Sequence, residues 1–433
     1  YQRALNWWAG ARDIELARTR YLRMVWKMAK PAWMEARYYR YGNYGNAIPL
    51  DILNNALKIA VTAEDKAHAN FLIAMSVRYT GDPKSRQRAQ EAFEGAIKAG
   101  KTTDWYDDAL FNYAEWLSQY GPVTVVQSDD GPRWRQAPDY VKAVELYRRL
   151  LAEFKEGETQ YYSNANERLK YLTRPSINVT VSNVFLPGSE IQYQTNWRNV
   201  KQLDFTLYKV DLTTEVAPDA NTSAYEWLQG IDLAKAAVVK TWSKETGDKG
   251  DYTPGYLTLR LDEKLPVGAY VLAGRGGGAG DRDLVLVSDA ALVLKSAGKQ
   301  ALVYVCSAED GAPVAKARVR LWQRFYNGNA WNWRSLDGET NEQGLKLFDI
   351  QLDNNNSAEL VATANRDSRQ AFALGNCYYY WQRPDSWRIY ALTDRPAYRP
   401  GEAARWKFTA RRYNGATYST PANETVEYEI HDP

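Results

Sequence analysis

The first 174 residues show apolar positions that recur with the period of an α-helix. One apolar face comprises Leu53, Ala56, Leu57, Ala60 and Val61, and the next comprises Ala67, Phe71, Ala74, Met75 and Val77. Later helices are predicted from Ser85 to Ala99, from near Asp104, from Ala137, and through Ala165, Leu169 and Leu172. Gly100 stands where a helix C-terminal cap is expected. We therefore expect an α-helical domain over residues 1–174.

This helical part has features of a repeat. Tyr140–Leu151 resembles the second helix of a tetratricopeptide-type repeat, in which small residues let paired helices approach and large aromatic residues fill the holes. The fold prediction is accordingly a tetratricopeptide-like solenoid. The polar stretch from Val123 to Arg135 interrupts the helical pattern, and we predict a loop there.

After Pro175 the apolar period changes to two, which is typical of half-buried strands. The alternation runs through Ile177–Val181, Gln192–Trp197 and Leu203–Val210. An Ala- and Leu-rich stretch from Ala224 to Val239 predicts a helical insertion. Gly274–Gly280 predicts a hairpin tip and not a phosphate-binding loop, because neither Lys-Ser/Thr nor a helix follows it.

Strand and turn patterns repeat to the end of the chain and indicate antiparallel β-sandwiches. We predict one sandwich over residues 175–288, with the helical insertion near 224–240, and a second over 289–384. Residues 385–433 are predicted to be the start of a third, truncated sandwich. The chain begins at Tyr1 and stops at Pro433 inside a strand pattern, so we expect it to be part of a larger protein.

Charge and hydropathy narrow the classes of function. The chain carries 55 Lys and Arg against 52 Asp and Glu, so no long-range field favours nucleic acid or an anionic membrane. The basic clusters Arg18–Arg23 and Lys84–Arg88 are expected on solvated helix faces. No apolar run reaches the roughly 18 residues of a membrane span.

Residues with catalytic or metal-binding chemistry are sparse. The 2 histidines, His68 and His431, nearly exclude a histidine-based metal site, and His68 is expected at the surface of its helix or packed in a pair. Asp107-Asp108 and Asp129-Asp130 are adjacent in sequence, which does not favour a paired catalytic site. Asp353–Asn356 lacks the spacing of a calcium loop and predicts a turn. We predict no catalytic, cofactor-binding or metal-binding residue, no cofactor, and no enzyme activity.

Cysteine and aromatic residues leave two questions open. Cys306 and Cys377 fall in the same predicted sandwich and either form a disulfide or remain separate buried thiols. Trp331-Asn332-Trp333 and Tyr378–Trp381 are denser in aromatic residues than a core requires, which makes them candidates for a contact surface.

The most specific motif is Leu392-Thr393-Asp394-Arg395-Pro396-Ala397-Tyr398-Arg399-Pro400-Gly401-Glu402. Each Pro removes a backbone donor, so the motif predicts a strand entry followed by a tight turn. It resembles the opening of a macroglobulin-type β-sandwich of the alpha-2-macroglobulin and complement family. Leu265–Ala273, Asp310–Val314 and Thr340–Leu345 carry further motifs of the same kind.

The resemblance covers residues 176–433 and implies a stack of such sandwiches. Many members of the family carry a bait region and a Cys-x-x-Gln thioester that captures a protease. Cys306 is followed by Ser307-Ala308-Glu309 and Cys377 by Tyr378-Tyr379-Tyr380, so neither matches the thioester and no family catalytic residue is carried over.

The helical N-terminal part is similar to that of large bacterial macroglobulin-like proteins of the cell envelope. The resemblance implies the N-terminal scaffold of a protease-trapping inhibitor that is periplasmic, envelope-anchored or secreted, with proteases as partners. The alternative is a non-inhibitory scaffold, in which the helical-repeat groove binds a protein or peptide and the sandwiches are spacers.

Overall fold

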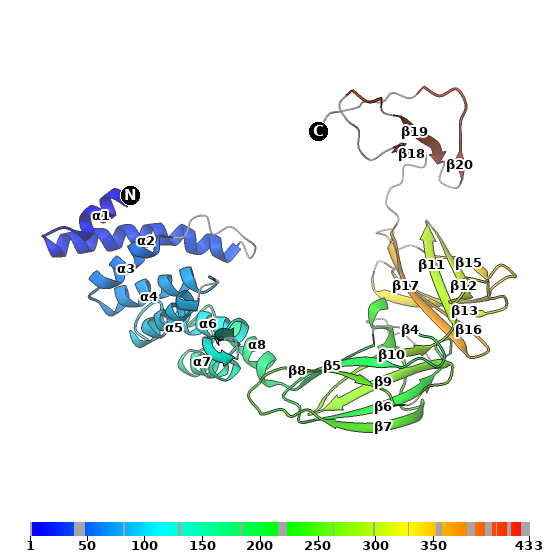
Figure 1. The fold of residues 1–433 in the computed structure, drawn as a ribbon, viewed down its shortest axis with the longest axis horizontal. Helices are drawn as coiled ribbons and strands as arrows, with labels where there is room; N and C mark the ends of the chain where they lie inside the picture. The colour runs from blue at the N-terminus through cyan, green and yellow to red at the C-terminus, as the bar shows by residue number, and fades with distance from the viewer. Residues whose placement is uncertain are drawn as a thin grey trace.

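The computed structural model of the chain describes residues 2–38, 48–80, 83–128, 131–181, 184–214, 223–262, 264–297, 299–327, 329–351, 357–378, 386–394, 401–403, 405–413 and 417–425. In these residues the helices come first, and β-sheets follow from Ser176 onward (Figure 1). The predicted order of a helical part followed by β-sheets is therefore confirmed. No helix within the described ranges combines the length and apolarity needed to cross a membrane.

Eight α-helices are described, and they pack in chain order around one core. They are α1 (Gln2–Ala9), α2 (Ile14–Tyr38), α3 (Leu50–Ile59), α4 (Ala63–Val77), α5 (Pro83–Lys98), α6 (Tyr106–Gln119), α7 (Tyr140–Glu153) and α8 (Tyr162–Thr173). Phe71, Phe93, Trp116 and Tyr147 are fully buried between neighbouring helices. Side chains of Thr62 and Asp139 accept backbone hydrogen bonds at the starts of α4 and α7. The tetratricopeptide-like character of this row stays a prediction.

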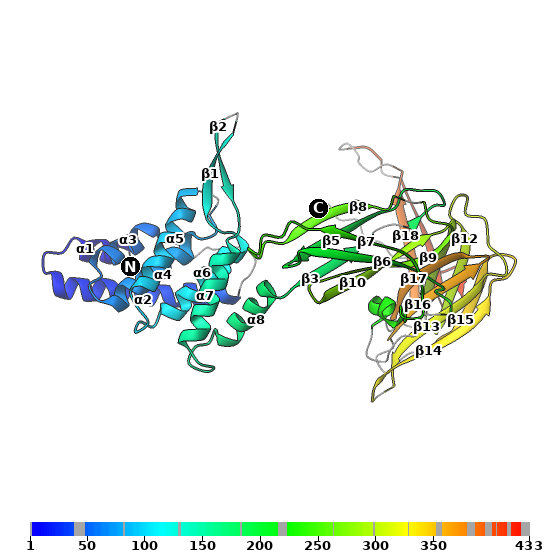
Figure 2. The same cartoon turned by 90° about the horizontal axis from the view of Figure 1, so that it is seen from below.

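The prediction of a loop from Val123 to Arg135 is wrong. The segment is a β-hairpin of β1 (Val123–Ser128) and β2 (Gly131–Gln136), which stands away from the helices in Figure 2. β-branched residues in Val123–Val126 favour a strand. At the hairpin base Gly121 has φ +67°, and a Cβ there would lie 1.8 Å from the Ala137 carbonyl oxygen.

Two sheets and the core between them follow the helices. Their strands are β3 (Ser176–Thr180), β4 (Val184–Phe185), β5 (Gln192–Arg198), β6 (Gln202–Val210), β7 (Ala237–Glu245), β8 (Gly255–Arg260), β9 (Gly268–Gly276) and β10 (Ala279–Val287). One sheet has the order β4-β10-β9-β6-β7 and the other β3-β5-β8, antiparallel except for β4–β10. Tyr193, Phe205 and Leu272 lie in the core between the sheets. The glycine-rich stretch forms the β9–β10 turn, as predicted.

The helical insertion predicted near 224–240 is wrong over most of its length. Only Ala224–Gly230 is helical, as the short 3-10 helix η1, and Ala237–Glu245 is the edge strand β7. Tertiary context overrides the helix propensity of Ala and Leu here, because η1 packs into a core shared with a later strand while β7 pairs with β6.

A second pair of sheets packs on the first. Its strands are β11 (Ala290–Ala297), β12 (Gln300–Ser307), β13 (Arg318–Tyr326), β14 (Trp331–Glu339), β15 (Leu345–Asp349), β16 (Ser357–Arg366) and β17 (Arg369–Tyr378). The sheet orders are β11-β12-β15 and β14-β13-β16-β17, with Val303, Leu321 and Leu360 in the core between them. A last sheet of β18 (Ser386–Thr393), β19 (Trp406–Tyr413) and β20 (Tyr418–Ser419) follows. The domain boundaries given above stay predictions.

Candidate functional site

Asp107 and Asp108 have structural roles in the described part of the chain. Asp107 accepts a hydrogen bond from Thr159 Oγ1 and Asp108 one from the hydroxyl of Tyr161, so both tie the start of α8 to α6. Asp129-Asp130, Asp353–Asn356 and His431 lie outside the described residues. Within the described part of the chain, no three His, Cys, Asp or Glu side chains gather in a way that fits a metal ion.

His68 lies inside the helical part and not at its surface. Its ring stacks between Trp26 of α2 at 3.9 Å and Trp105, just before α6, at 3.8 Å between ring centroids. His68 is 9% exposed. The surface option is therefore wrong, and the ring packs between two tryptophans that the sequence did not indicate.

The structure describes the side chain of one of the two cysteines, Cys306. Cys306 is a buried free thiol at the end of β12, so a bridge to Cys377 is not formed. Cys377 lies in β17, but its side chain is outside the described part. Trp331 is 38% exposed on the edge strand β14. The guanidinium carbon of Arg324 lies 4.3 Å from the centroid of the Trp331 ring. Of the Tyr378–Trp381 cluster no side chain is described.

Buried tyrosines bound to carboxylates join four consecutive helices. Tyr113 of α6 donates to Glu94 of α5 at 2.9 Å, and Tyr106 of α6 donates to Glu153 of α7 at 2.6 Å. Tyr147 of α7 donates to Glu115 of α6, which also forms an ion pair with Arg168 of α8. The sequence predicted the helices that carry these tyrosines, but it did not indicate the partners of their hydroxyl groups.

These contacts shift the acidities of the groups involved. Burial, and next the hydrogen bond to Glu153, raise the pKa of Tyr106 to about 12. Burial also raises the pKa of Tyr113 and Tyr147 above the ordinary value of a phenol. Burial acts to raise the pKa of Glu153, but hydrogen bonds from Tyr106 and Arg149 outweigh burial, so the pKa is lowered. The phenols thus remain donors and Glu153 remains a carboxylate at neutral pH.

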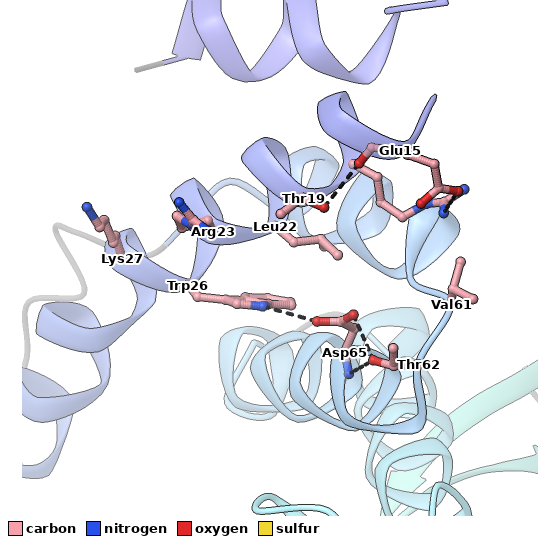
Figure 3. A pocket seen from close by; sticks show the side chains of 10 residues that line it. Glu15, Thr19, Leu22, Arg23, Trp26, Lys27, Val61, Thr62 and Asp65 are labelled. Carbon is pink, nitrogen blue, oxygen red and sulfur yellow. Dashed lines mark hydrogen bonds and ion pairs between the residues drawn. The ribbon is translucent and has the colours of Figure 1, made fainter. Parts of the chain in front are cut away.

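Surface grooves follow the row of helices. One, of about 600 Å³, lies between α2 and the start of α4, where Trp26 Nε1 donates to Asp65 and Asp65 accepts from Thr62 (Figure 3). A second, of about 610 Å³, lies along α5, α6 and α7, and we name it the α5–α7 groove. It is lined by Glu94, Ile97, Lys98, Gly100, Lys101, Tyr106, Tyr113, Lys142, Leu146, Arg149 and Glu153. Both fall within the usual size range of ligand-binding pockets, about 300–1,000 Å³.

Side chains from the first pair of sheets join it to the helical part, among them Asn199 and Arg198. Asn199, after β5, donates to the carbonyl oxygens of Leu172 at 2.8 Å and Arg174 at 3.1 Å, which end α8. The buried Arg198 guanidinium lies over the rings of Tyr140 and Tyr171, 4.9 Å and 5.2 Å from their centroids. These contacts restrain the junction.

The two pairs of sheets share a buried boundary. Trp227 of η1 lies 5.2 Å from Phe372 of β17, in a cluster with residues of β6, β9, β10 and β16. Gln370 accepts from the Leu212 amide at 2.7 Å and donates to the Val210 carbonyl at 3.1 Å.

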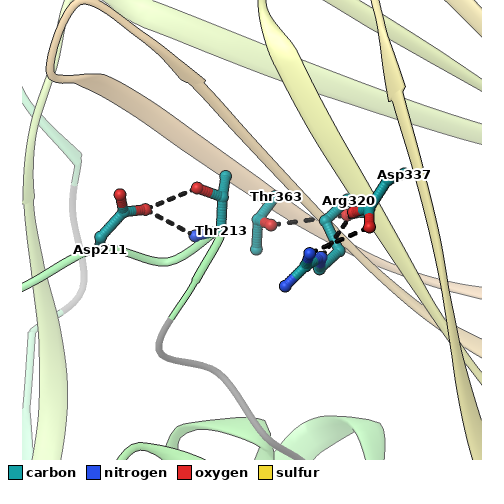
Figure 4. Close-up of polar contacts among 5 residues, drawn as sticks. All are labelled: Asp211, Thr213, Arg320, Asp337 and Thr363. Carbon is teal, nitrogen blue, oxygen red and sulfur yellow. Dashed lines mark hydrogen bonds and ion pairs between the residues drawn. The ribbon is translucent and has the colours of Figure 1, made fainter.

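Polar residues continue along this boundary. Asp211 accepts from the amide and hydroxyl of Thr213, and Arg320 makes a two-point ion pair with Asp337 nearby (Figure 4). Asn365 donates to Asp211 at 3.3 Å across the boundary. The sheets thus form a coupled scaffold in which these polar groups hold the structure together.

No family model matches the chain. A curated alpha-2-macroglobulin of Ralstonia nicotianae is 29% identical over 171 residues, which is 39% of this chain and 10% of that protein. This likeness agrees with the motifs between Leu265 and Glu402. The chain is similar to bacterial alpha-2-macroglobulins. The resemblance inferred from the sequence is therefore confirmed, and the macroglobulin-like chain spans about a tenth of that relative's length.

Solved bacterial alpha-2-macroglobulins are also among the structural neighbours of the macroglobulin-like chain. The Escherichia coli structure spanning domains MG0-NIE-MG1 has a TM-score of 0.30 and 18% identity, covering 46% of this chain and 64% of that one. A Salmonella alpha-2-macroglobulin mutant has a TM-score of 0.21 and 13% identity, covering 55% of this chain and 18% of that one.

Proposed function

We propose that this chain is the N-terminal structural scaffold of a bacterial alpha-2-macroglobulin-like protein that traps proteases in envelope defence. The observation that carries the proposal is the 171-residue likeness to the Ralstonia protein. The coupled sheets fit this role, because a steric trap needs rigid modules that hold their relative positions.

The proposal assigns the chain a non-enzymatic role. Its carboxylates bind tyrosines, threonines and backbone groups within the fold, and Cys306 is buried and lacks the thioester motif. Proteases are the proposed partners of the intact protein. The proposed location is the periplasm, the envelope or the exterior of the cell, as the family resemblance implies.

The test uses the intact gene product that contains this sequence. It is mixed with a broad-specificity protease, and residual cleavage is measured on a large protein substrate and on a small chromogenic peptide. Loss of the large-substrate activity alone, with a single cut in the protein, supports a trap. Equal residual activity on both substrates contradicts it.

The second candidate function is a non-inhibitory binding scaffold. The grooves of the helical part favour it, because they are preformed and open to solvent on a well-packed row of helices. Binding of a protein or peptide to the helical part, without protection of large substrates from proteases, is the result that distinguishes it.

A further inference from the structure

The α5–α7 groove has an excess of positive charge on its rim. Lys98, Lys101, Lys142 and Arg149 line it, against the carboxylates Glu94 and Glu153. Lys98 and Lys142 are exposed. Lys98 makes no ion pair with another described residue, and Lys142 pairs only with the exposed Glu145 of its own helix at 2.9 Å. A surface pair of this kind contributes little to stability, so both ammonium groups are available to an incoming anion.

The two carboxylates of the groove are already engaged from the protein side. Glu153 accepts from Tyr106 and from Arg149, whose Nε lies 2.8 Å away. Glu94 accepts from Tyr113 and from Gln90. Glu153 is thus already paired with Arg149, and the remaining basic side chains of the rim outnumber the remaining carboxylate, Glu94.

The wall and floor of the groove are mixed in chemistry. Tyr106, Tyr113 and Leu146 are buried and present a firm surface, and Ile97 adds a half-buried aliphatic side chain. Gly100 has φ +105°, and a Cβ there would meet nothing within 4 Å, so the α5–α6 turn leaves the groove open at this point. Carboxylate acceptors, ammonium donors and apolar atoms together fit a peptide better than a uniformly charged polymer.

We propose that the α5–α7 groove binds an acidic peptide segment of a partner protein, with Lys98 and Lys142 contacting its carboxylates. A nucleic acid or an acidic polysaccharide is disfavoured, because the excess of positive charge is small and part of the wall is apolar, which suits a short acidic segment better than a long row of anions. The proposal rests on the second candidate function, binding by the helical part, and it is independent of protease trapping.

The test is an array of random peptides of about ten residues, graded by net charge and probed with the fluorescently labelled chain. Lys98→Glu/Lys142→Glu is compared with Lys58→Glu/Lys244→Glu, which makes the same charge change at exposed residues outside the groove. Circular dichroism and thermal melts establish that both variants fold. We expect the wild type to enrich acidic peptides, and the groove variant to bind them at least about tenfold more weakly.

The control variant is expected to bind as the wild type does, and added salt to weaken the binding. Enrichment of neutral or basic peptides, or equal binding by the groove variant, overturns the proposal. Tighter binding of heparin or single-stranded DNA than of any acidic peptide also overturns it. Binding of neutral peptides to the helical part would contradict the acidic-peptide proposal, but it would still support the second candidate function.

Discussion

At the scale of single residues, stability in the helical part depends on buried hydroxyl groups that reach a carboxylate. Tyr147 is fully buried and donates to Glu115. Tyr147→Phe removes that donor and leaves Glu115 with Arg168 as its main partner. We expect a loss of about 1–2 kcal/mol in the free energy of unfolding, measured by urea denaturation. Tyr120→Phe, which removes an exposed hydroxyl, is the control and should change stability little.

The raised tyrosine pKa values predict a loss of stability at alkaline pH. Burial raises the pKa of Tyr106 and Tyr193 from 10.0 to about 12. Between these values the unfolded chain releases phenol protons that the folded chain retains, so the free energy of unfolding falls as pH rises. Tyr106→Phe should make the decline shallower in urea titrations at successive pH values. A decline of unchanged slope would contradict the assignment.

Single residues also show which features of the fold the sequence alone could not predict. Helical spacing correctly placed Ala67 and Phe71 in the core, because the period of a helix is local information. His68 packs between Trp26 and Trp105, which are distant from it in the chain, so no local sequence pattern could predict its environment. The groove lysines likewise appear as ordinary helix-surface residues until α5 and α7 are brought together.

At the scale of elements, the β1–β2 hairpin depends on a close approach at Gly121. A Cβ at this position would lie 1.8 Å from the Ala137 carbonyl oxygen, and φ is +67°. Gly131 also has a positive φ, +106°, but a Cβ there would meet nothing within 4 Å. We expect Gly131→Ala to cost about 1–2 kcal/mol from the backbone alone, and Gly121→Ala clearly more. Thermal melts of the two variants make the comparison, and equal losses would contradict the steric account.

The 3-10 helix η1 is expected to hold the two pairs of sheets together. Trp227 is 2% exposed and packs on Phe372, and the Ala224 amide donates to Glu359 at 2.7 Å. Trp227→Ala should lower the free energy of unfolding by about 3–5 kcal/mol. Denaturant unfolding followed by circular dichroism measures this. The exposed Trp387 in β18 provides a matched Trp→Ala control, which should change stability far less.

Most elements were predictable, and the failures have identifiable causes. The Pro and Gly breaks located α4 to α8 to within a few residues, because those residues act locally on the backbone. At residues 123–136 the β-branched run was present, but the acidic and basic residues around it suggested a loop. From Ala224 to Val239 composition suggested a helix, whereas only Ala224–Gly230 is helical and Ala237–Glu245 pairs with β6 as a strand.

At the scale of the whole molecule, the helices and the first two pairs of sheets are connected through Asn199, Arg198 and the Trp227 cluster. The family resemblance was predictable from short turn motifs, since these depend on Pro and Gly at fixed spacings. The contacts that couple one pair of sheets to the next were not predictable, because they join residues 150 or more positions apart.

The central claim is that this coupled scaffold serves a protease trap, and one measurement tests it most directly. The intact protein, as wild type and as Trp227→Ala, is treated with a protease, and the ratio of residual activity on a large substrate to that on a small peptide is determined. The account predicts a low ratio for the wild type and a ratio closer to that of free protease for the variant. A wild-type ratio equal to that of free protease would contradict the claim.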